Sequence, residues 1–285
     1  MGRPNVGKST LINSLLGQKV AAVSPRPQTT RKRQLGILTG ENYQIVFVDT
    51  PGVHSPRHKL GEKMNQFALE ILRESDLVLF LADASQEPDE EDRLLADNLK
   101  KLSRNTPVIL VLNKIDLVSP GLLDDRITAY QKLVEAARFQ LVSASQGTHL
   151  DELLALILTF LPEGTLIFPE DQVTDYYERE IAADLIREAC LIELRDEVPH
   201  GIAVRMDQYI ERDTGGAYIE ATVIVEREAH KGIVIGQEGR MIKRIGERAR
   251  LEIEAMTGRK VYVKLRVKVR KNWRDDEKIL GWFGY

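Results

Sequence analysis

The first ten residues contain the side chains whose types and spacing suggest the most specific chemistry. Gly2, Gly7, Lys8 and Ser9 fit G-x-x-x-x-G-K-[ST], the pattern of a phosphate-binding loop. In such a loop, backbone N–H groups converge on nucleotide phosphates, the lysine neutralises the β- and γ-phosphates, and the serine hydroxyl ligates Mg²⁺. An ordinary glycine-containing turn before a helix can match the same pattern, so motifs later in the chain must decide between the two.

Further polar motifs follow predicted strands, and each has a task at a nucleotide. They are Asp49-Thr50-Pro51-Gly52, Asn113-Lys114-Ile115-Asp116 and Ser143-Ala144. The first is D-x-x-G, in which the carboxylate holds the water shell of Mg²⁺ and the Gly52 N–H senses the γ-phosphate. In the second, N-K-x-D, we expect Asn113 to tie the loops together and the Lys114 stem to cover the base.

The N-K-x-D motif predicts a preference for guanine. The Asp116 carboxylate can accept hydrogen bonds from the ring N–H and the exocyclic amine of guanine, whereas adenine offers no such pair of donors. Charge-assisted bonds contribute roughly 1.5–3 kcal/mol each, so two of them discriminate by a factor of hundreds or more. We expect the Ala144 N–H to meet the guanine carbonyl.

The elements that must position these motifs alternate between strands and helices. Strand-like runs cover residues 34–39, 43–49, 77–82, 107–112 and 139–142, and a helix is predicted over 59–74. This pattern predicts an open α/β sheet that binds its ligand along one edge. The acidic stretch 87–92 is interpreted as a solvated loop with a charged helix start rather than a metal site.

The catalytic side of the site lacks a residue that many small GTPases have. After D-x-x-G they carry a glutamine that orients the attacking water, and here that position is Val53. His54 is more readily a surface residue than a base, so we expect slow intrinsic hydrolysis. Thr29 and Thr30 lie in a long loop and are both candidates to ligate Mg²⁺; spacing does not choose between them.

The second half of the chain predicts an RNA-binding module. A helix over 178–195 precedes strand-like runs over 202–211 and 216–226. Gly236 and Gly239 then form a G-x-x-G loop with V-I-G before it and I-x-x-I after it, the pattern of the clamp by which KH domains grip single-stranded RNA. Glu238 opposes this function, because it places a negative charge where a phosphate should pass.

The C-terminal segment is basic and partly aromatic. The run 260–269 alternates Val or Leu with Lys or Arg, which predicts a half-buried edge strand whose basic face could also follow a phosphate backbone. Trp273, Trp282, Phe283 and Tyr285 could stack on bases or close the core. Residues 198–285 carry a net charge of +5 and residues 1–197 a net charge of −8, so a polyanion should bind the second half.

Composition narrows the class of protein. The 285 residues are 43% hydrophobic and 29% charged, which is typical of a soluble globular chain of two domains. The single cysteine, Cys190, lies on an apolar helical face and is predicted to be core in a reducing compartment. No apolar run is long enough to span a bilayer, and no secretion leader is recognised before the loop.

Taken together, G-R-P-N-V-G-K-S, D-T-P-G, N-K-I-D and V-I-G-Q-E-G resemble the Era GTPase family over essentially the whole chain. The resemblance includes Gln28-Thr29-Thr30-Arg31 and the segment from Trp273 to Glu277. It implies a Ras-like P-loop GTPase domain over 1–164, then a linker and an α+β type II KH domain over 165–285, with the KH core at about 198–274. It also implies binding of GTP and GDP, of 16S ribosomal RNA and the 30S subunit, and no binding of DNA. The expected location is the cytoplasm, with peripheral association at the inner membrane.

The resemblance assigns roles to individual residues. It implies catalytic roles for Lys8, Asn5, Thr30 and Gly52, and Mg²⁺ ligation by Ser9, Thr30 and Asp49; Thr30 is preferred to Thr29. Asn5 would help to bind K⁺. The expected nucleotide contacts are Gly2, Arg3, Pro4, Asn5, Val6, Gly7, Lys8, Ser9, Asp49, Thr50, Pro51, Gly52, Val53, Asn113, Lys114, Ile115, Asp116, Ser143 and Ala144. The expected RNA contacts are Ile235, Gly236, Gln237, Glu238, Gly239, Arg240 and Lys243.

One departure from the family pattern keeps other functions open. Era-like chains have an apolar strand immediately before the phosphate loop, and here Met1 is adjacent to Gly2. We therefore expect the first strand to be missing, Gly2 to lack a strand that fixes it, and GTP binding by the chain from Met1 to be poor. The alternatives to a GTP-hydrolysing switch are a non-enzymatic RNA-binding assembly factor with an impaired G domain and a membrane-docked signalling GTPase.

Overall fold

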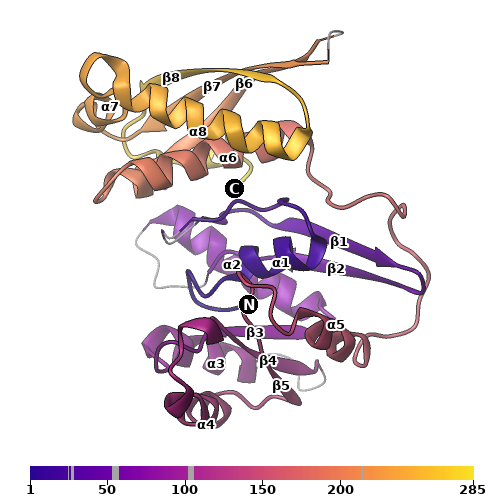
Figure 1. Cartoon of the computed structure of the whole chain (residues 1–285). Helices are drawn as coiled ribbons and strands as arrows, with labels where there is room; N and C mark the ends of the chain where they lie inside the picture. The colour runs from indigo at the N-terminus through magenta and orange to yellow at the C-terminus, as the bar shows by residue number, and fades with distance from the viewer. Residues whose placement is uncertain (25, 27–28, 53–57, 102–105, 213–214) are drawn as a thin grey trace. The chain divides into compact units, whose positions relative to one another are not determined.

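The computed structural model describes the chain except residues 25, 27–28, 53–57, 102–105 and 213–214 (Figure 1). The predictions for Val53, His54 and Gln28 therefore fall outside the described residues. The chain divides into two compact units: residues 1–19, 30–56 and 61–175 form the first, and residues 20–29, 57–60 and 176–285 form the second. None of the helices in the described ranges is both long and apolar enough to cross a membrane.

The first unit alternates strands with helices, as predicted. Its elements are α1 (Lys8–Leu16), β1 (Gln34–Gly40), β2 (Tyr43–Asp49), α2 (Lys59–Glu74), β3 (Val78–Asp83), α3 (Glu90–Lys101), β4 (Val108–Asn113), α4 (Leu123–Leu133), β5 (Arg138–Leu141) and α5 (Leu150–Leu158). The amphipathic helix α2 shows why the periodicity was informative: Leu60, Met64, Ala68 and Leu72 recur every four residues and are all buried.

The strands of this unit form separate sheets. β1 and β2 pair as an antiparallel hairpin across Glu41 and Asn42, and β3, β4 and β5 form a parallel sheet with β4 in the centre. β4 is buried along most of its length, as expected for a parallel strand covered on both faces. The carboxyl ends of β3 and β4, where polar residues leave the sheet, therefore lie beside each other.

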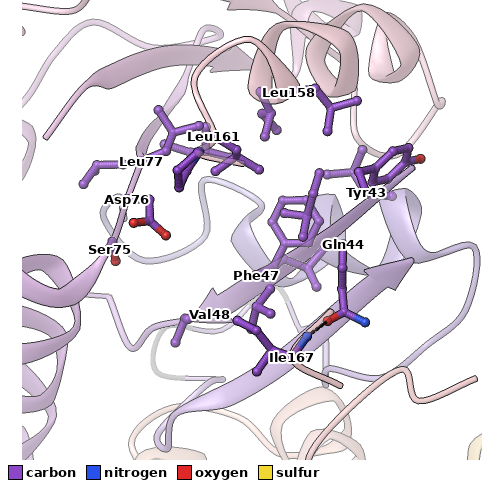
Figure 2. Close-up of a pocket in the computed structure, with 18 of the residues that line it drawn as sticks. Tyr43, Gln44, Phe47, Val48, Ser75, Asp76, Leu77, Leu158, Leu161 and Ile167 are labelled. Atoms are coloured by element: carbon purple, nitrogen blue, oxygen red, sulfur yellow. Dashed lines mark hydrogen bonds between the residues drawn. The ribbon is translucent and has the colours of Figure 1, made fainter. Parts of the chain in front are cut away.

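β2 and β3 are not hydrogen-bonded to each other, and a cavity of about 1320 Å³ separates them (Figure 2). Apolar side chains of both strands and of α1, α2 and α5 line it. Met1 borders this cavity and pairs with β3: its α-ammonium donates to Leu79 O at 2.6 Å, and its carbonyl accepts from Leu81 N at 2.8 Å. Burial lowers the pKa of that ammonium to about 5. Gly2, for which we expected no strand to fix it, is thus held by the hydrogen bonds of its neighbour Met1 to β3.

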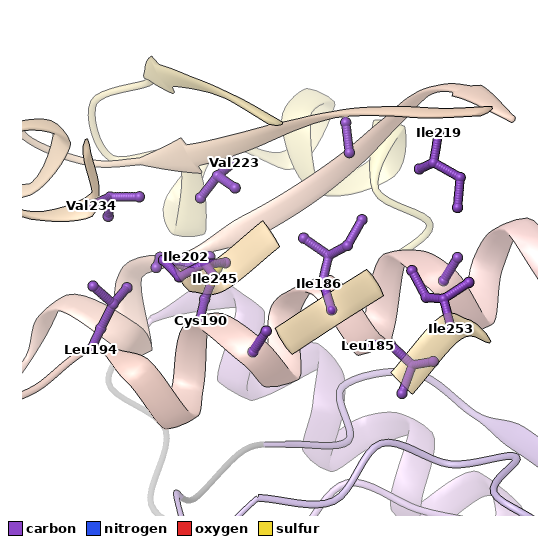
Figure 3. Close-up of a cluster of buried hydrophobic side chains, with 14 of the residues drawn as sticks. Leu185, Ile186, Cys190, Leu194, Ile202, Ile219, Val223, Val234, Ile245 and Ile253 are labelled. Atoms are coloured by element: carbon purple, nitrogen blue, oxygen red, sulfur yellow. The ribbon is translucent and has the colours of Figure 1, made fainter. Parts of the chain in front are cut away.

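The second unit is a helical layer on a sheet. Its elements are α6 (Glu178–Glu193), β6 (Ala203–Glu211), β7 (Ala217–Val225), α7 (Glu228–Ile235), α8 (Arg240–Thr257), β8 (Val261–Val269) and α9 (Glu277–Trp282). The strand order is β6-β7-β8, with β6 antiparallel and β8 parallel to β7. Figure 3 shows the apolar core between the helices and the sheet. Cys190 is fully buried there, as predicted.

The C-terminal aromatic residues divide between core and surface. Trp273 is fully buried, donates from Nε1 to Gly201 O at 2.9 Å and packs edge-on against Phe283. Trp282, in contrast, is 75% exposed. The open choice between base stacking and core closure is thus settled for Trp273, which closes the core.

The segment predicted as a linker is bound to the first unit. The side-chain oxygen of Gln44 accepts from the backbone N–H groups of Ile167 and Phe168, both at 2.9 Å, while its nitrogen donates to Phe168 O (Figure 2). Farther along, Ile37 N donates to Val173 O at 2.9 Å. These bonds hold the segment along the β1–β2 hairpin, and the first unit accordingly ends at residue 175 rather than at 164.

The cavity between β2 and β3 generates a prediction about stability. Val78 N donates to the carbonyl of Pro107, just before β4, so the N–H groups of Leu79 and Leu81 face the opposite edge. Leu81 N donates there to Met1 O, and Leu79 lines the cavity beside it. An added apolar extension of about six residues ahead of Met1 would be long enough, at roughly 3.3 Å per residue, to pair along this edge. We expect it to raise the melting temperature of the first unit, by roughly 2–4 °C for each kcal/mol gained.

Calorimetry and hydrogen exchange at the Leu79 amide would measure this effect. The matched control is a Gly/Ser extension of equal length, which can reach the cavity but buries little apolar surface. Equal melting temperatures for the two extended chains would contradict the prediction.

Candidate functional site

The phosphate loop is formed, and its second glycine is required by close contact. Gly7 has a φ of 100°, and a Cβ atom added there would lie 2.3 Å from Asn113 Nδ2. Helix α1 begins at the next residue, Lys8, so the loop leads directly into a helix N-terminus. The N–H groups of the loop and the positive end of the helix dipole therefore point to the same place, which favours the binding of an anion there.

Lys8 is held over this loop. Its Nζ donates to the carbonyl oxygens of Gly2 and Arg3, both at 2.9 Å. Desolvation by burial lowers the pKa of Lys8 to about 8, and the charge of Asp49 opposes that shift. The partners of this ammonium are carbonyl dipoles and a nearby carboxylate. A phosphate would bind the ammonium more strongly than the carbonyl groups do.

The residues predicted to ligate Mg²⁺ lie in mutual contact. Ser9 Oγ donates to Asp49 Oδ2 at 2.7 Å, Thr30 Oγ1 donates to the same oxygen at 2.9 Å, and the two hydroxyls are 2.9 Å apart. Thr29 is bonded elsewhere, to Arg26 O at 2.8 Å, so of the two threonines Thr30 is the one at this cluster.

The cluster fits a hard cation. The other carboxylate oxygen of Asp49, Oδ1, is buried with no hydrogen-bond partner among the described residues, and burial raises the pKa of Asp49. Three oxygen ligands near an unsatisfied carboxylate oxygen are the donor set that Mg²⁺ prefers. In the described part of the chain no three His, Cys, Asp or Glu side chains gather as a metal site, so carboxylate clusters offer no competing site.

Asn113 joins the phosphate loop to the loop after β5. Its Nδ2 donates to Val6 O at 2.8 Å, and its Oδ1 accepts from Ala144 N at 2.9 Å. Asn113 is nearly fully buried at the end of the central strand β4. The Ala144 N–H, which we expected to meet the guanine carbonyl, is therefore already donated to Asn113 in this structure.

The residues expected at the base lie together at the edge of the sheet. Asp116 Oδ1 accepts from Ser143 Oγ at 2.5 Å. Lys114 Nζ pairs with Asp83 Oδ2 at 2.6 Å, which anchors the lysine stem at the end of β3. The lysine ammonium holds the pKa of the Asp83 carboxyl below its usual value. Asp83 was not predicted, although its position at a strand end, like that of Asn113, was the available signal.

The remaining predicted nucleotide contacts surround the phosphate loop. Gly52 is buried against Pro4, and a Cβ added to it would lie 2.9 Å from that ring. Thr50 and Pro51 are buried beside it, while Ile115 is only partly buried. Asn5 is exposed at the tip of the loop, with a φ of 65°.

Arg3 has partners that the sequence did not indicate. It pairs with Asp89, approaches Asp92 at 3.4 Å and donates to Gln86 Oε1 at 2.8 Å. Asp92 is fully buried and also accepts from the Tyr130 hydroxyl at 3.3 Å. The interpretation of 87–92 as a purely solvated segment is therefore wrong for Asp92, which fastens the start of α3 to the phosphate loop.

The G-x-x-G loop lies between α7 and α8. Gly236 has a φ of 72°, and a Cβ on it would lie 2.7 Å from the Met241 side chain, so this tight approach requires glycine. Gln237, Glu238, Arg240 and Lys243 are exposed around the loop, and Ile235 is partly buried. Glu238 Oε2 accepts from Arg240 at 3.0 Å, so the acid that opposes phosphate binding is paired within the loop.

Comparisons with known proteins match both halves of the chain. The family model described as 50S ribosome-binding GTPase matches residues 1–114, and the KH domain model matches residues 197–274. The chain is 47% identical to GTPase Era of Clostridium botulinum (strain Eklund 17B / Type B), over the whole chain and 96% of that protein. It is 46% identical to GTPase Era of Geobacter metallireducens, over the whole chain and 95% of that protein.

Solved structures agree as well. A crystal structure of Era in complex with MgGDPNP and nucleotides 1506–1542 of 16S ribosomal RNA matches with a TM-score of 0.93 and 42% identity, over 100% of this chain and 96% of that one. A variant of Aquifex aeolicus Era bound to GDP.AlF4⁻ matches with the same TM-score, 41% identity and the same coverage. These similarities extend through the P-loop GTPase domain and the KH domain alike, and the chain belongs to the Era family of GTPases.

Proposed function

We propose that this chain is a GTP-hydrolysing switch whose nucleotide state controls how its KH domain holds the 3′ end of 16S ribosomal RNA. The observation that carries this proposal is the contact among Ser9, Thr30 and Asp49 beside Lys8. Thr30 comes from the segment between α1 and β1, so a ligand that engages Thr30 acts directly on this segment. The Era structure with bound 16S RNA nucleotides supports the RNA partner.

The wider cellular role is inferred from the same Era relatives. We place the chain in small (30S) subunit biogenesis in the cytoplasm. Peripheral contact with the inner membrane stays a prediction of the family resemblance.

Each of these residues has its own role at the nucleotide. Loop amides and α1 receive the phosphates, and Lys8 turns from the Gly2 and Arg3 carbonyls to the β- and γ-phosphates. Ser9 and Thr30 hydroxyls would hold Mg²⁺, with Asp49 orienting its water shell; the bound ion neutralises charge that develops on the phosphates. Asp116 accepts from guanine, and Gly52 senses the γ-phosphate through its N–H.

Hydrolysis itself should be slow in the isolated chain. Valine at position 53 can neither orient nor deprotonate the attacking water. We propose that Asn5, exposed at the tip of the phosphate loop, helps to seat K⁺ near the phosphates. A monovalent cation there would stabilise the same developing charge that an arginine finger stabilises in other GTPases.

Base choice is tested by Asp116→Asn. The carboxamide donates where the carboxylate accepted, so preference should move from GTP toward xanthosine triphosphate. Loss of two charge-assisted bonds should weaken GTP binding by a factor of hundreds or more. Titration with both fluorescent nucleotides measures the change, and Asp124→Asn, on the nearby helix α4, is the control. Unchanged GTP affinity would show that this loop does not read the base.

The lowered pKa of Lys8 predicts a pH dependence of nucleotide binding. The phosphates bind the protonated ammonium, and the free protein loses that proton as pH rises through about 8. Affinity for GDP should therefore fall as pH increases, by about tenfold one unit above that pKa. Lys8→Arg stays charged throughout and should show no such fall in this range. Parallel pH profiles for the two proteins would exclude Lys8 as the cause.

The cation proposal is tested by the rate of GTP hydrolysis in matched K⁺ and Na⁺ buffers. We expect slow turnover in Na⁺ and a faster rate in K⁺, with the difference reduced in Asn5→Ala. Equal rates in both salts would remove the cation role. Fast turnover in Na⁺ would instead show that the chain has a catalytic residue other than those named here, which compensates for the valine at position 53.

The whole proposal is tested by RNA binding with and without a non-hydrolysable GTP analogue. The probe is an RNA with the sequence of nucleotides 1506–1542 of 16S ribosomal RNA. Affinity should change with nucleotide, and Gly236→Asp with Gly239→Asp should abolish tight binding while GTP hydrolysis remains, because charge and bulk block the phosphate path.

The alternative functions predict different outcomes. Binding that ignores nucleotide would favour an RNA-binding assembly factor with an impaired G domain. Absence of RNA binding in the unmodified chain would refute the RNA half of the proposal.

A further inference from the structure

One face of the second unit's sheet is turned away from α6 and α8 and has a distinct composition. Along β8, Val261, Val263, Leu265, Val267 and Val269 pack toward the core, which the helices α6 and α8 close (Figures 1 and 3). The alternating residues point to the opposite side. We call this side the outer sheet face. It comprises Tyr262, Lys264, Arg266, Lys268 and Arg270, with Arg205, Asp207, Gln208, Ile210, Tyr218, Glu220, Thr222 and the buried Ile224 from the neighbouring strands.

Cations form a row on this face. Lys264, Arg266, Lys268 and Arg270 are all exposed and follow one another at every second residue, which spaces their Cα atoms at about 6.6 Å. Arg270 extends the row past the end of β8, because its N–H donates to Val225 O as the next step of the ladder. A straight row of regularly spaced cations suits the repeating charges of a nucleic-acid backbone.

The acids on this face do not cancel the row. Glu220 is buried and accepts from the Tyr218 hydroxyl at 2.9 Å, while Arg266 and Lys264 lie 2.6 and 3.5 Å from its two oxygens. Asp207 is paired with Arg205 at 2.7 Å and accepts from Thr222. Lys268 and Arg270 form no ion pair with any residue that the structure describes, so their charges are available to a ligand.

An aromatic stack lies at the start of the row. Tyr218 and Tyr262 are parallel, with ring centroids 5.7 Å apart and 9° between the planes. Tyr262 is 59% exposed, so it presents surface beyond the part that Tyr218 covers. An exposed aromatic ring beside a basic track is the combination on which single-stranded nucleic acids stack their bases.

Protection against aggregation and membrane binding each account for only part of this pattern. Lysines on an edge strand discourage aggregation, but that function needs no stacked tyrosines. An anionic membrane would also attract the cations, yet Ile210 is the one large aliphatic side chain exposed on this face among the described residues. Interfacial membrane binding requires a broad apolar surface beside the charges.

We propose that the outer sheet face binds a second segment of single-stranded RNA, separate from the segment that the G-x-x-G loop grips. The G-x-x-G loop joins α7 to α8 and belongs to the helical layer, whereas this face lies on the other side of the sheet. The roughly four nucleotides that a KH loop clamps would not extend to both surfaces. This inference rests on the RNA binding proposed above and adds a second surface to it.

The test compares two lengths of single-stranded RNA of mixed sequence across a salt series. One is about four nucleotides long, enough for the loop alone, and the other is about sixteen, a length that single-strand sites reach. Lys268→Gln with Arg270→Gln should lower the slope of log K against log salt by about 1.4 for the longer RNA, at roughly 0.7 per lost phosphate contact. The same variant should leave binding of the shorter RNA unchanged.

A second variant tests stacking. Tyr262→Leu keeps an apolar side chain against Tyr218 but removes the aromatic ring, and it should weaken binding of the longer RNA by about fivefold or more. Circular dichroism and melting temperature would establish that both variants fold. The matched control is Arg93→Gln with Lys132→Gln, which removes two exposed positive charges from the first unit.

The outcomes separate this inference from the proposed function. An unchanged slope in Lys268→Gln with Arg270→Gln, or an equal loss in the control pair, would overturn it. The inference would also be overturned if the unmodified chain bound phosphatidylserine vesicles and the variants lost that binding while they kept full RNA affinity. The face would then serve a membrane. If the unmodified chain binds the shorter RNA and gains nothing from the longer one, this inference alone fails. If it binds neither, the proposed RNA function fails and this inference with it.

Discussion

The hydrogen bonds of one buried carboxamide set the geometry of the nucleotide site. Asn113 donates to Val6 O in the phosphate loop and accepts from Ala144 N in the loop after β5. Only an amide side chain offers a donor and an acceptor in this arrangement; aspartate at neutral pH would have no proton for Val6. Gly7 must lack a Cβ because this amide occupies the adjacent space. The spacing between the surfaces for phosphate and for base thus depends on a single side chain at the end of the central strand.

The second unit depends in the same way on the alternation of one strand. Every second residue of β8 is apolar and packs toward α6 and α8, and this fixes the remaining residues on the opposite side of the sheet. A register shift of one residue would bury the cations and expose the core, so the pattern specifies the pairing with β7 strongly. The first unit shows a related constraint: where β2 and β3 are unpaired, their apolar side chains line a cavity.

Much of this could be predicted from the sequence because the signals were local. The hairpin of β1 and β2, helix α2 and the strands of the second unit have strong periodicity or turn residues, and their bounds agree with the structure within about two residues. The fold class and family were confirmed. What could not be predicted depends on tertiary contacts. The burial of Asp92 requires Arg3 and Tyr130, and the docking of residues 167–168 requires the side chain of Gln44. The residues that make these contacts lie far apart in the sequence. Helix α4 was not predicted, because its periodicity is weak.

The pairing of Glu238 with Arg240 affects how selective the G-x-x-G loop can be. Glu238 has a φ of 52° and its carboxylate is bonded to the guanidinium that an incoming phosphate would use. If the loop binds RNA as proposed, a phosphate at Arg240 would exchange one ionic partner of that guanidinium for another, which makes binding a competition between two anions. A polyanion that contacts only Arg240 gains little binding free energy from such an exchange. An RNA strand that also fits against the backbone of the two glycines gains the free energy of those backbone contacts in addition. For the RNA binding proposed above, the acid would then act as a threshold against loose association. Added salt, which screens both competitors, should affect this step less than the number of charges alone would suggest.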